Sequence, residues 1–206
     1  MVPILIIECN VKKKRTELVL IGPPTAGKST LGMTLAKMLE REYVSLDSLR
    51  NEIFDVLDYN VEKAESLLIN YGFEALFEYW RPFECVVLET CINEFKNCVF
   101  DVGAGYVIQS QQDLVIRTDS ALAPFQHIVK IDFCSDPELS ASLMKQRLQK
   151  RDRLTQNSQS CAETNMILAS MFVGNPAYAR YAQHTVYTHQ RTVQECAADI
   201  LANSTS

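Results

Sequence analysis

Apolar positions along the chain form short runs that alternate with longer stretches of helical spacing. Five runs have the length and composition of strands, at residues 18–21, 43–47, 98–102, 127–133 and 185–187. Helical spacing predicts helices at 31–40, 51–95, 137–153, 166–173, 177–182 and 192–202. Strands that alternate with helices predict an α/β fold, with a parallel sheet of about five strands and helices on both faces.

The N-terminal segment and the long helical region depart from a simple alternation of strands and helices. Residues 1–15 predict an additional N-terminal strand at 2–7, followed by the charged run Lys12 to Arg15 as a solvated turn, with nucleotide steering as the alternative role of those charges. Within 48–95 we expect a break at 71–73 and a helix restart at Pro82. We expect Trp80 in the core. No linker divides the chain, so the prediction is a single domain over 1–206.

The first strand runs directly into the motif G-x-x-x-x-G-K-[ST], and a helical pattern follows it. Gly22 and Gly27 allow tight turns, Lys28 can reach the β- and γ-phosphates, and the Ser29 hydroxyl can hold Mg²⁺. Strand, loop and helix in this order predict a three-layer P-loop NTPase fold that binds ATP with Mg²⁺. The expected nucleotide-binding residues are Gly22, Pro24, Thr25, Ala26, Gly27, Lys28, Ser29 and Thr30.

Two aspartates are expected at the carboxyl ends of strands, where parallel sheets bind ligands. Asp47 ends the second strand and is predicted to face the nucleotide, and it can also cap the following helix. Asp101 lies in the third strand, where a carboxylate can hold Mg²⁺ together with Ser29. The alternative for Asp101 is a carboxylate paired with backbone N–H groups alone.

A basic helix end leads into a polar segment at 147–165. Arg147, Arg151 and Arg153 fit a lid that closes over a triphosphate and expels water. The competing interpretation is that these cations stabilise a helix C-terminus before an exposed loop.

Composition narrows the function classes. A net charge of −5 argues against general nucleic-acid binding, and the apolar run at 2–7 is too short to span a membrane. Seven cysteines without a C-x-x-C pair favour reduced thiols in a cytoplasmic protein, and three histidines show no metal-binding spacing. The expected partner is a small-molecule acceptor, and the expected state is a monomer or weak dimer.

The order of these features resembles the shikimate kinases over about residues 17 to 203. The resemblance rests on the phosphate loop, Asp47, Gly72-Phe73, the turn at 103–105 and the segment from Asn175 to Ala182. It implies that Asp47 binds acceptor hydroxyls and acts as the base, and that a lid arginine contacts the phosphates. It also implies that Gly103, Ala104 and Gly105 pack against the acceptor.

Several positions depart from the family pattern. In the family, two arginines clamp the acceptor's carboxylate, and here Glu74 and Gly174 stand in their places. The family's lid pattern Arg-Pro-Leu-Leu is not intact, and the nearest stretch is Arg151-Asp152-Arg153-Leu154. The aspartate that commonly stands two residues before Asp47 is Ser45, while Asp101 stands where the family often has a hydroxyl residue. We therefore hypothesise that the metal-side carboxylate has moved from the second strand to the third.

These observations predict a small-molecule kinase resembling shikimate kinase, with an acceptor that need not be shikimate. If Glu74 and Glu78 line the acceptor pocket, the acceptor is neutral and hydroxyl-rich or cationic; otherwise they form an exposed acidic face. One alternative is a nucleotide-binding regulatory protein that phosphorylates no acceptor. Another is a nucleoside- or sugar-type kinase of the same superfamily, with Arg50 contacting the acceptor.

Overall fold

A computed structural model describes residues 14–154 and 162–204 of the chain. Five parallel strands form one sheet in the order β2-β3-β1-β4-β5. Their bounds are β1 Arg15–Ile21, β2 Glu42–Ser45, β3 Cys98–Asp101, β4 Phe125–Asp132 and β5 His184–Tyr187. The predicted α/β fold with a five-stranded parallel sheet is confirmed. The extra strand expected at 2–7 lies outside the described residues.

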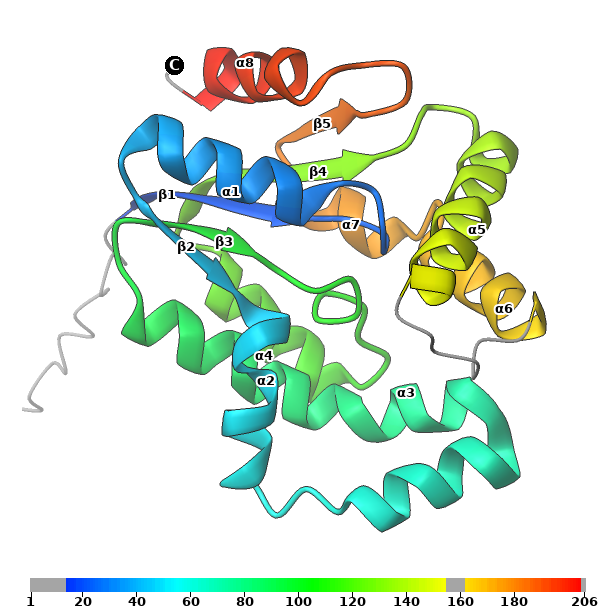
Figure 1. The fold of residues 1–206 in the computed structure, drawn as a ribbon. Helices are drawn as coiled ribbons and strands as arrows, with labels where there is room; N and C mark the ends of the chain where they lie inside the picture. Colours follow the sequence, from blue (N-terminus) through cyan, green and yellow to red (C-terminus); the bar gives the residue numbers. More distant parts are fainter. Residues whose placement is uncertain (1–13, 155–161, 205–206) are drawn as a thin grey trace, which may run out of the picture.

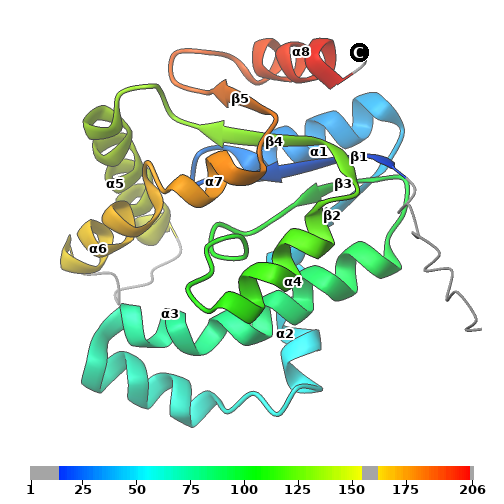
Figure 2. The same cartoon turned by 180° about the vertical axis from the view of Figure 1, so that it is seen from behind.

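Helices cover both faces of the sheet (Figures 1 and 2). On one face lie α1 Lys28–Leu39 and α8 Val193–Ser204, which pack against each other. Below the other face lie α3 Val61–Glu94 and α4 Gln112–Leu122, which are also in contact. The sequence pattern had not indicated α4, whose buried residues Leu114, Thr118 and Leu122 include a polar one.

The remaining helices surround the carboxyl ends of the strands. Helix α2 Leu46–Asp55 follows β2 and contacts α3. Helices α5 Pro137–Leu154 and α6 Ala162–Phe172 lie together beyond the ends of the strands, and α7 Pro176–Tyr181 contacts β4. In the described chain these helices therefore stand around the edge of the sheet where the phosphate loop emerges from β1.

The core is continuous from the central strands into the helices. Leu18 to Ile21 of β1 are buried at 2% exposure or less, because helices cover both faces of this central strand. The rings of Phe100 and Phe125, on the two strands beside β1, meet edge to face at 5.8 Å. This packing holds the N-terminal part of β1, where Arg15 is the register partner of Phe125.

Helix α3 corrects one expectation and confirms another. Gly72 has φ 80° and ψ −176° and breaks the helix as predicted. Pro82, however, lies inside a helix that continues to Glu94 and does not start a new one. Proline removes one backbone hydrogen bond there, and burial of Cys85, Val87 and Leu88 on the following turns offsets that loss.

Arg15 is also misplaced by the sequence pattern. It begins β1 instead of extending a solvated turn, and its guanidinium lies 4.5 Å from the ring centroid of Phe125. The same group forms an ion pair of 2.6 Å with Glu17. An aromatic ring and a paired carboxylate thus compensate the arginine for its loss of water. Lys14 is exposed, as expected.

Candidate active site

The phosphate loop connects β1 to α1 as the motif predicts. Gly22 has φ 137°, and a Cβ atom there would lie 2.1 Å from the carbonyl oxygen of Ile131 on β4. Gly27, with φ 109°, is the N-cap of α1. Glycine at 22 is therefore required both by the backbone conformation and by the close approach of a neighbouring strand.

Lys28 points back into the loop. It is 8% exposed, and its Nζ donates hydrogen bonds to the carbonyl oxygens of Gly22 (2.9 Å) and Pro23 (3.1 Å). Burial lowers the pKa of Lys28, while the charges of Asp101 and Asp47 act to raise it. The ammonium group is thus held in the interior of a loop whose backbone can accept an anion.

Ser29 and Asp101 lie together, and Tyr43 joins them. The Asp101 Oδ2 atom accepts hydrogen bonds from Ser29 Oγ (2.7 Å) and from the Tyr43 hydroxyl (2.8 Å). Burial, followed by the charge of Asp101, raises the pKa of Tyr43 to about 12, so the phenol remains a donor. We did not predict a role for Tyr43 from the sequence. The available signal was a tyrosine in one predicted strand and an aspartate in the next predicted strand.

Sheet register explains how Asp101 reaches this place. Ser45 on β2 and Asp101 on β3 are register partners in adjacent parallel strands. Gly32 on α1 makes room for the tyrosine, since a Cβ there would lie 2.7 Å from Tyr43 Cε2. Asp101 on β3 therefore lies directly beside position 45 on β2, which is the arrangement that the hypothesis of a displaced carboxylate requires.

The donor set suits a hard cation. No group of three or more His, Cys, Asp or Glu side chains that could hold a metal ion occurs within residues 14–154 and 162–204. A metal at Ser29 and Asp101 would therefore rely on a hydroxyl, a carboxylate, phosphate oxygens and water. Such oxygen ligands fit Mg²⁺ bound with a nucleotide.

The three arginines predicted for a lid have different surroundings. Arg147 Nη1 donates to the carbonyl oxygen of Thr25 in the phosphate loop (2.9 Å), and its guanidinium lies 5.0 Å from the Phe133 ring centroid. Burial lowers the pKa of Arg147. Arg151 lines the cleft described below. The side chain of Arg153 and the segment 155–161 lie outside the described residues.

One cleft of about 410 Å³ brings most of the predicted residues together. Its phosphate end consists of Pro24, Thr25, Lys28, Ser29 and Asp101. Its acceptor end is formed by α2, α3 and the turn after β3, with Asp47, Arg50, Phe73, Phe77, Trp80, Glu84, Ala104, Gly105 and Tyr106. Helices α5 and α6 complete the wall with Leu148, Arg151, Leu168 and Phe172.

Asp47 reaches the cleft from a different element than predicted. It lies in the first turn of α2 and not at the end of β2, which stops at Ser45. The helix begins at Leu46 with Ser45 at the N-cap position, so Asp47 is not the N-cap that we expected. The Ser45 side chain makes no capping hydrogen bond. The first turn of α2 nonetheless directs Asp47 into the same cleft as Lys28.

The turn after β3 is tightly packed against the acceptor end. A Cβ at Gly103 would lie 2.4 Å from Asp47 Oδ1, and one at Gly105 would lie 2.8 Å from Glu84 Oε2. Ala104 and Gly105 line the cleft directly, whereas Gly103 supports Asp47 from beside it. Small residues at these positions allow two carboxylates to approach the backbone.

Glu84 is a cleft residue that sequence reasoning missed. It is 3% exposed, and its Oε1 lies 3.8 Å from Arg50 Nη1. Burial raises the pKa of Glu84 to about 7, although the charge of Arg50 acts to lower it. A carboxylate inside the apolar helix segment around Cys85 and Val87 was the available signal.

Glu74 and Glu78 are not among the residues that line the cleft. Glu74 is exposed. Glu78 pairs with Arg81 at 2.8 Å and accepts a hydrogen bond from Ser110. Trp80 is half-buried and packs against the core as expected, and its ring also lines the cleft, 5.0 Å from the Arg50 guanidinium. Glu74 thus belongs to the exposed-face alternative.

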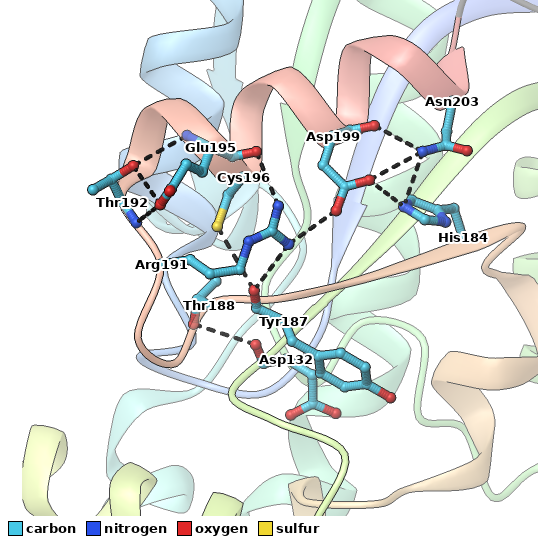
Figure 3. A network of polar contacts seen from close by, with 10 residues as sticks. All are labelled: Asp132, His184, Tyr187, Thr188, Arg191, Thr192, Glu195, Cys196, Asp199 and Asn203. Carbon is cyan, nitrogen blue, oxygen red and sulfur yellow. Dashed lines mark hydrogen bonds and ion pairs between the residues drawn. The ribbon is translucent and has the colours of Figure 1, made fainter.

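A polar network joins β5, the loop that follows it and α8 (Figure 3). Thr188, just after β5, donates from Oγ1 to the carbonyl oxygen of Ala26 (2.9 Å) and lies 3.2 Å from that of Asp132. Arg191 and His184 both contact Asp199 on α8, at 2.9 and 3.3 Å. Helix α8 is thereby connected through the β5–α8 loop to the phosphate loop.

Five of the seven cysteines lie in the described part of the chain. Cys85, Cys91, Cys98 and Cys196 are free and buried, and Cys134 is free and half-buried. His127 lies within β4 and His184 opens β5. Among the described residues, no helix combines the length and apolar character needed to cross a membrane.

The fold and the loop define the class of protein. A parallel sheet with a phosphate loop between its first strand and first helix is the architecture of the P-loop NTPases. The sequence model of the shikimate kinase family matches residues 24–205, so the chain belongs to the shikimate kinase family.

Individual relatives agree with this assignment. Shikimate kinase of Acinetobacter baylyi is 27% identical over 189 residues, which cover 88% of each chain. That of Francisella tularensis subsp. novicida is 32% identical over 93 residues, covering 45% of this chain and 47% of the relative.

Solved structures show the same fold. Shikimate kinase from Acinetobacter baumannii in complex with shikimate has a TM-score of 0.60 at 22% identity, covering 94% of this chain and 97% of that one. Shikimate kinase from Bacteroides thetaiotaomicron gives 0.58 at 17% identity, with 91% and 97% covered. A gluconokinase from Sinorhizobium meliloti 1021 gives 0.53 at 11% identity, with 93% of each chain covered.

Proposed function

We propose that the chain transfers the γ-phosphoryl group of ATP to a hydroxyl group of a small-molecule acceptor. The observation that carries this proposal is the shared cleft, in which Asp47 faces the same space as Lys28 and Ser29. A base for a hydroxyl and a cradle for phosphate are the two requirements of such a kinase. Membership of the shikimate kinase family supports the same reaction type.

The residues divide the work of the reaction. Asp47 orients the acceptor hydroxyl and takes its proton while the oxygen forms a bond to the γ-phosphorus. The bond from that phosphorus to the bridging oxygen breaks, and ADP leaves. Lys28 and the loop N–H groups stabilise negative charge on the moving phosphoryl group. Ser29 and Asp101 would hold Mg²⁺, which would supply further positive charge to the transferred phosphoryl group.

The lid closes the site in this proposal. Arg147 already contacts the phosphate loop, and Arg151 lines the cleft from α5. Arginines moved onto the phosphates would exclude water and reduce hydrolysis of ATP. Arg153 remains a third candidate for this role. We further expect a cytoplasmic monomer or weak dimer, which sedimentation of the purified chain would test.

The test is ADP release from Mg-ATP with and without acceptor. Shikimate, polyols, sugars and nucleosides are compared at equal concentration, with Lys28→Met as the inactive control and Glu74→Gln as the matched neutral control. At least one acceptor should raise ADP release well above the acceptor-free rate. Tight ATP binding without stimulation by any acceptor would instead favour a regulatory nucleotide-binding protein.

A further inference from the structure

The acceptor end of the cleft contains buried polar atoms without partners. Glu84 Oε2, the Tyr106 hydroxyl and Arg50 Nε have no hydrogen-bond partner, and all three residues line the cleft. Tyr106 is fully buried and Glu84 nearly so. Buried polar groups in folded proteins are almost always satisfied, so their concentration at one place indicates a ligand that satisfies them.

The charges at this end do not favour an anion. Asp47 and Glu84 contribute two carboxylates here beside Arg50, while the other two cations that line the cleft, Lys28 and Arg151, come from the start of α1 and from α5. Arg50 Nη1 lies 3.8 Å from Glu84 Oε1, and the Arg50 guanidinium lies over the Trp80 ring. A ligand carboxylate would therefore compete with Glu84 for an arginine that is already partly neutralised.

A second arginine on α3 is not available either. Arg81 is 7% exposed, donates to the carbonyl oxygen of Ile108 and forms its ion pair with Glu78. It is not among the residues that line the cleft. Gly174, at the other position where a clamping arginine was expected, has no side chain to offer. A bidentate carboxylate clamp made from two arginines is absent from these positions.

A hydroxyl group suits the unpaired atoms better than a carboxylate does. Burial raises the pKa of Glu84 to about 7, so near neutral pH the group occurs in both protonation states. A hydroxyl can donate to the ionised carboxylate or accept from the protonated one, whereas a carboxylate can only accept. The Tyr106 hydroxyl can donate to the same ligand oxygen.

We infer that the acceptor is a neutral polyol without a carboxylate, recognised through a second hydroxyl at Glu84 and Tyr106. Its reacting hydroxyl lies at Asp47, and the rings of Phe73, Phe77 and Trp80 contact its apolar C–H face. This inference rests on the proposed kinase function, because it assumes that Asp47 faces the acceptor. It concerns recognition, and recognition can be measured without turnover.

Matched pairs of acceptors test the inference directly. Each pair differs by one carboxylate in place of a hydroxymethyl group: gluconate and sorbitol, methyl glucuronide and methyl glucoside, shikimate and its hydroxymethyl analogue. Calorimetry gives the dissociation constant of each compound on the Mg-ADP-loaded protein, and ADP release gives kcat/KM. We expect the hydroxymethyl member of at least one pair to be favoured about tenfold or more, because the carboxylated member meets Glu84.

Variants locate the effect. Glu84→Gln and Tyr106→Phe should each weaken binding of the favoured polyol about tenfold, and Glu84→Gln should also reduce the preference over its carboxylated partner. Glu74→Gln, on the same helix but outside the cleft, should leave the dissociation constants unchanged. An unchanged dissociation constant for Mg-ADP shows that each variant remains folded.

The outcomes separate the two proposals. A preference for the carboxylated members, with turnover, overturns this inference and leaves the kinase function intact. Selective polyol binding that depends on Glu84, without any ADP release, supports the inference and counts against the kinase function. If no polyol of the series binds, the inference is overturned, and turnover of another acceptor class would decide the kinase function separately.

Discussion

The phosphate end and the acceptor end of the cleft differ in how their polar groups are paired. At the phosphate end Lys28 donates to the carbonyl oxygens of Gly22 and Pro23, and Ser29 and Tyr43 both donate to Asp101. Among the described residues of that end, the buried hydroxyl of Thr25 is unpaired. At the acceptor end Glu84 and Tyr106 carry unpaired atoms. In the proposed function the first end binds the nucleotide and the second binds the acceptor. On that proposal specificity depends on the acceptor end, and the following predictions test this division.

Asp47→Asn should separate the two ends most strongly. Loss of a general base typically lowers the rate by 10²–10⁴, and we expect about 10³-fold in kcat. Binding of Mg-ADP should change little, because Asp47 belongs to the acceptor end. Initial rates and calorimetry check the two halves of this prediction. A variant that keeps its rate would place the base elsewhere.

Lys28→Met should disable the phosphate end. Removal of a donor from a charge-stabilising site costs about 10²–10³ in kcat, which is the loss expected here. The variant should still bind the polyol acceptor, as measured by calorimetry without nucleotide. If acceptor binding is lost together with turnover, the two ends are not independent and the comparison breaks down.

Asp101→Asn and Tyr43→Phe test whether Asp101 and its hydrogen-bond donor contribute to metal binding. Groups that orient a metal ligand commonly contribute 10–100-fold in metal affinity. We expect Asp101→Asn to weaken Mn²⁺ binding in the presence of ADP more than Tyr43→Phe does, with Tyr43→Phe near tenfold. Paramagnetic resonance of bound Mn²⁺ provides a reading independent of activity. For Tyr43→Phe, saturating Mg²⁺ should restore kcat.

Unchanged Mg²⁺-dependent turnover in Asp101→Asn would contradict the displaced carboxylate. Thr34→Val, on the exposed side of α1, is a matched loss of a hydroxyl group and should leave Mn²⁺ binding as it is. A drop of equal size in that variant would indicate a general effect on α1 instead of a metal site.

The smallest effect concerns stability against pH. The folded pKa of Glu84 is about 7, above its ordinary value of 4.5, so the folded chain binds this proton more tightly than the unfolded chain. Its contribution to stability is present below about pH 4.5 and is lost as pH rises towards 7. The slope for one proton is at most about 1.4 kcal/mol per pH unit.

Urea unfolding at several pH values measures this contribution by difference. The free energy of unfolding of Glu84→Gln should decline less between pH 4.5 and 7 than that of the unchanged chain. Parallel curves for the two proteins would show that Glu84 keeps an ordinary pKa, and would weaken the description of the acceptor end.

Sequence reasoning predicted the phosphate end because its chemistry is local. Gly22 to Ser29 are consecutive, so a motif and its flanking pattern are sufficient to indicate loop, lysine and hydroxyl. Asp101 was also singled out, because burial of an unpaired carboxylate in an apolar strand costs free energy and so indicates a nearby cation or donor. The parallel direction of the sheet followed from the alternation of strands and helices, whereas the strand order β2-β3-β1-β4-β5 was not predicted.

The acceptor end was harder because it is assembled from distant segments. Glu84 reaches the cleft through the long helix α3, and the sequence does not show which face of that helix meets the turn after β3. Glu74 and Glu78 had the right spacing but lie beside the lining face of the helix, because each follows by one residue a ring that lines the cleft, Phe73 or Phe77. Periodicity identified the helix and could not orient it.

On the hypothesis of a displaced metal carboxylate, Asp101 and Ser45 illustrate how a functional group can change its position in an alignment and keep its place in space. Register partners on adjacent parallel strands lie about 4.8 Å apart. Family surveys that score each column separately would record the aspartate as lost at position 45 and overlook its gain at 101. Scoring pairs of cross-strand neighbours together would recover such exchanges and would help to separate diverged members of this family from inactive ones.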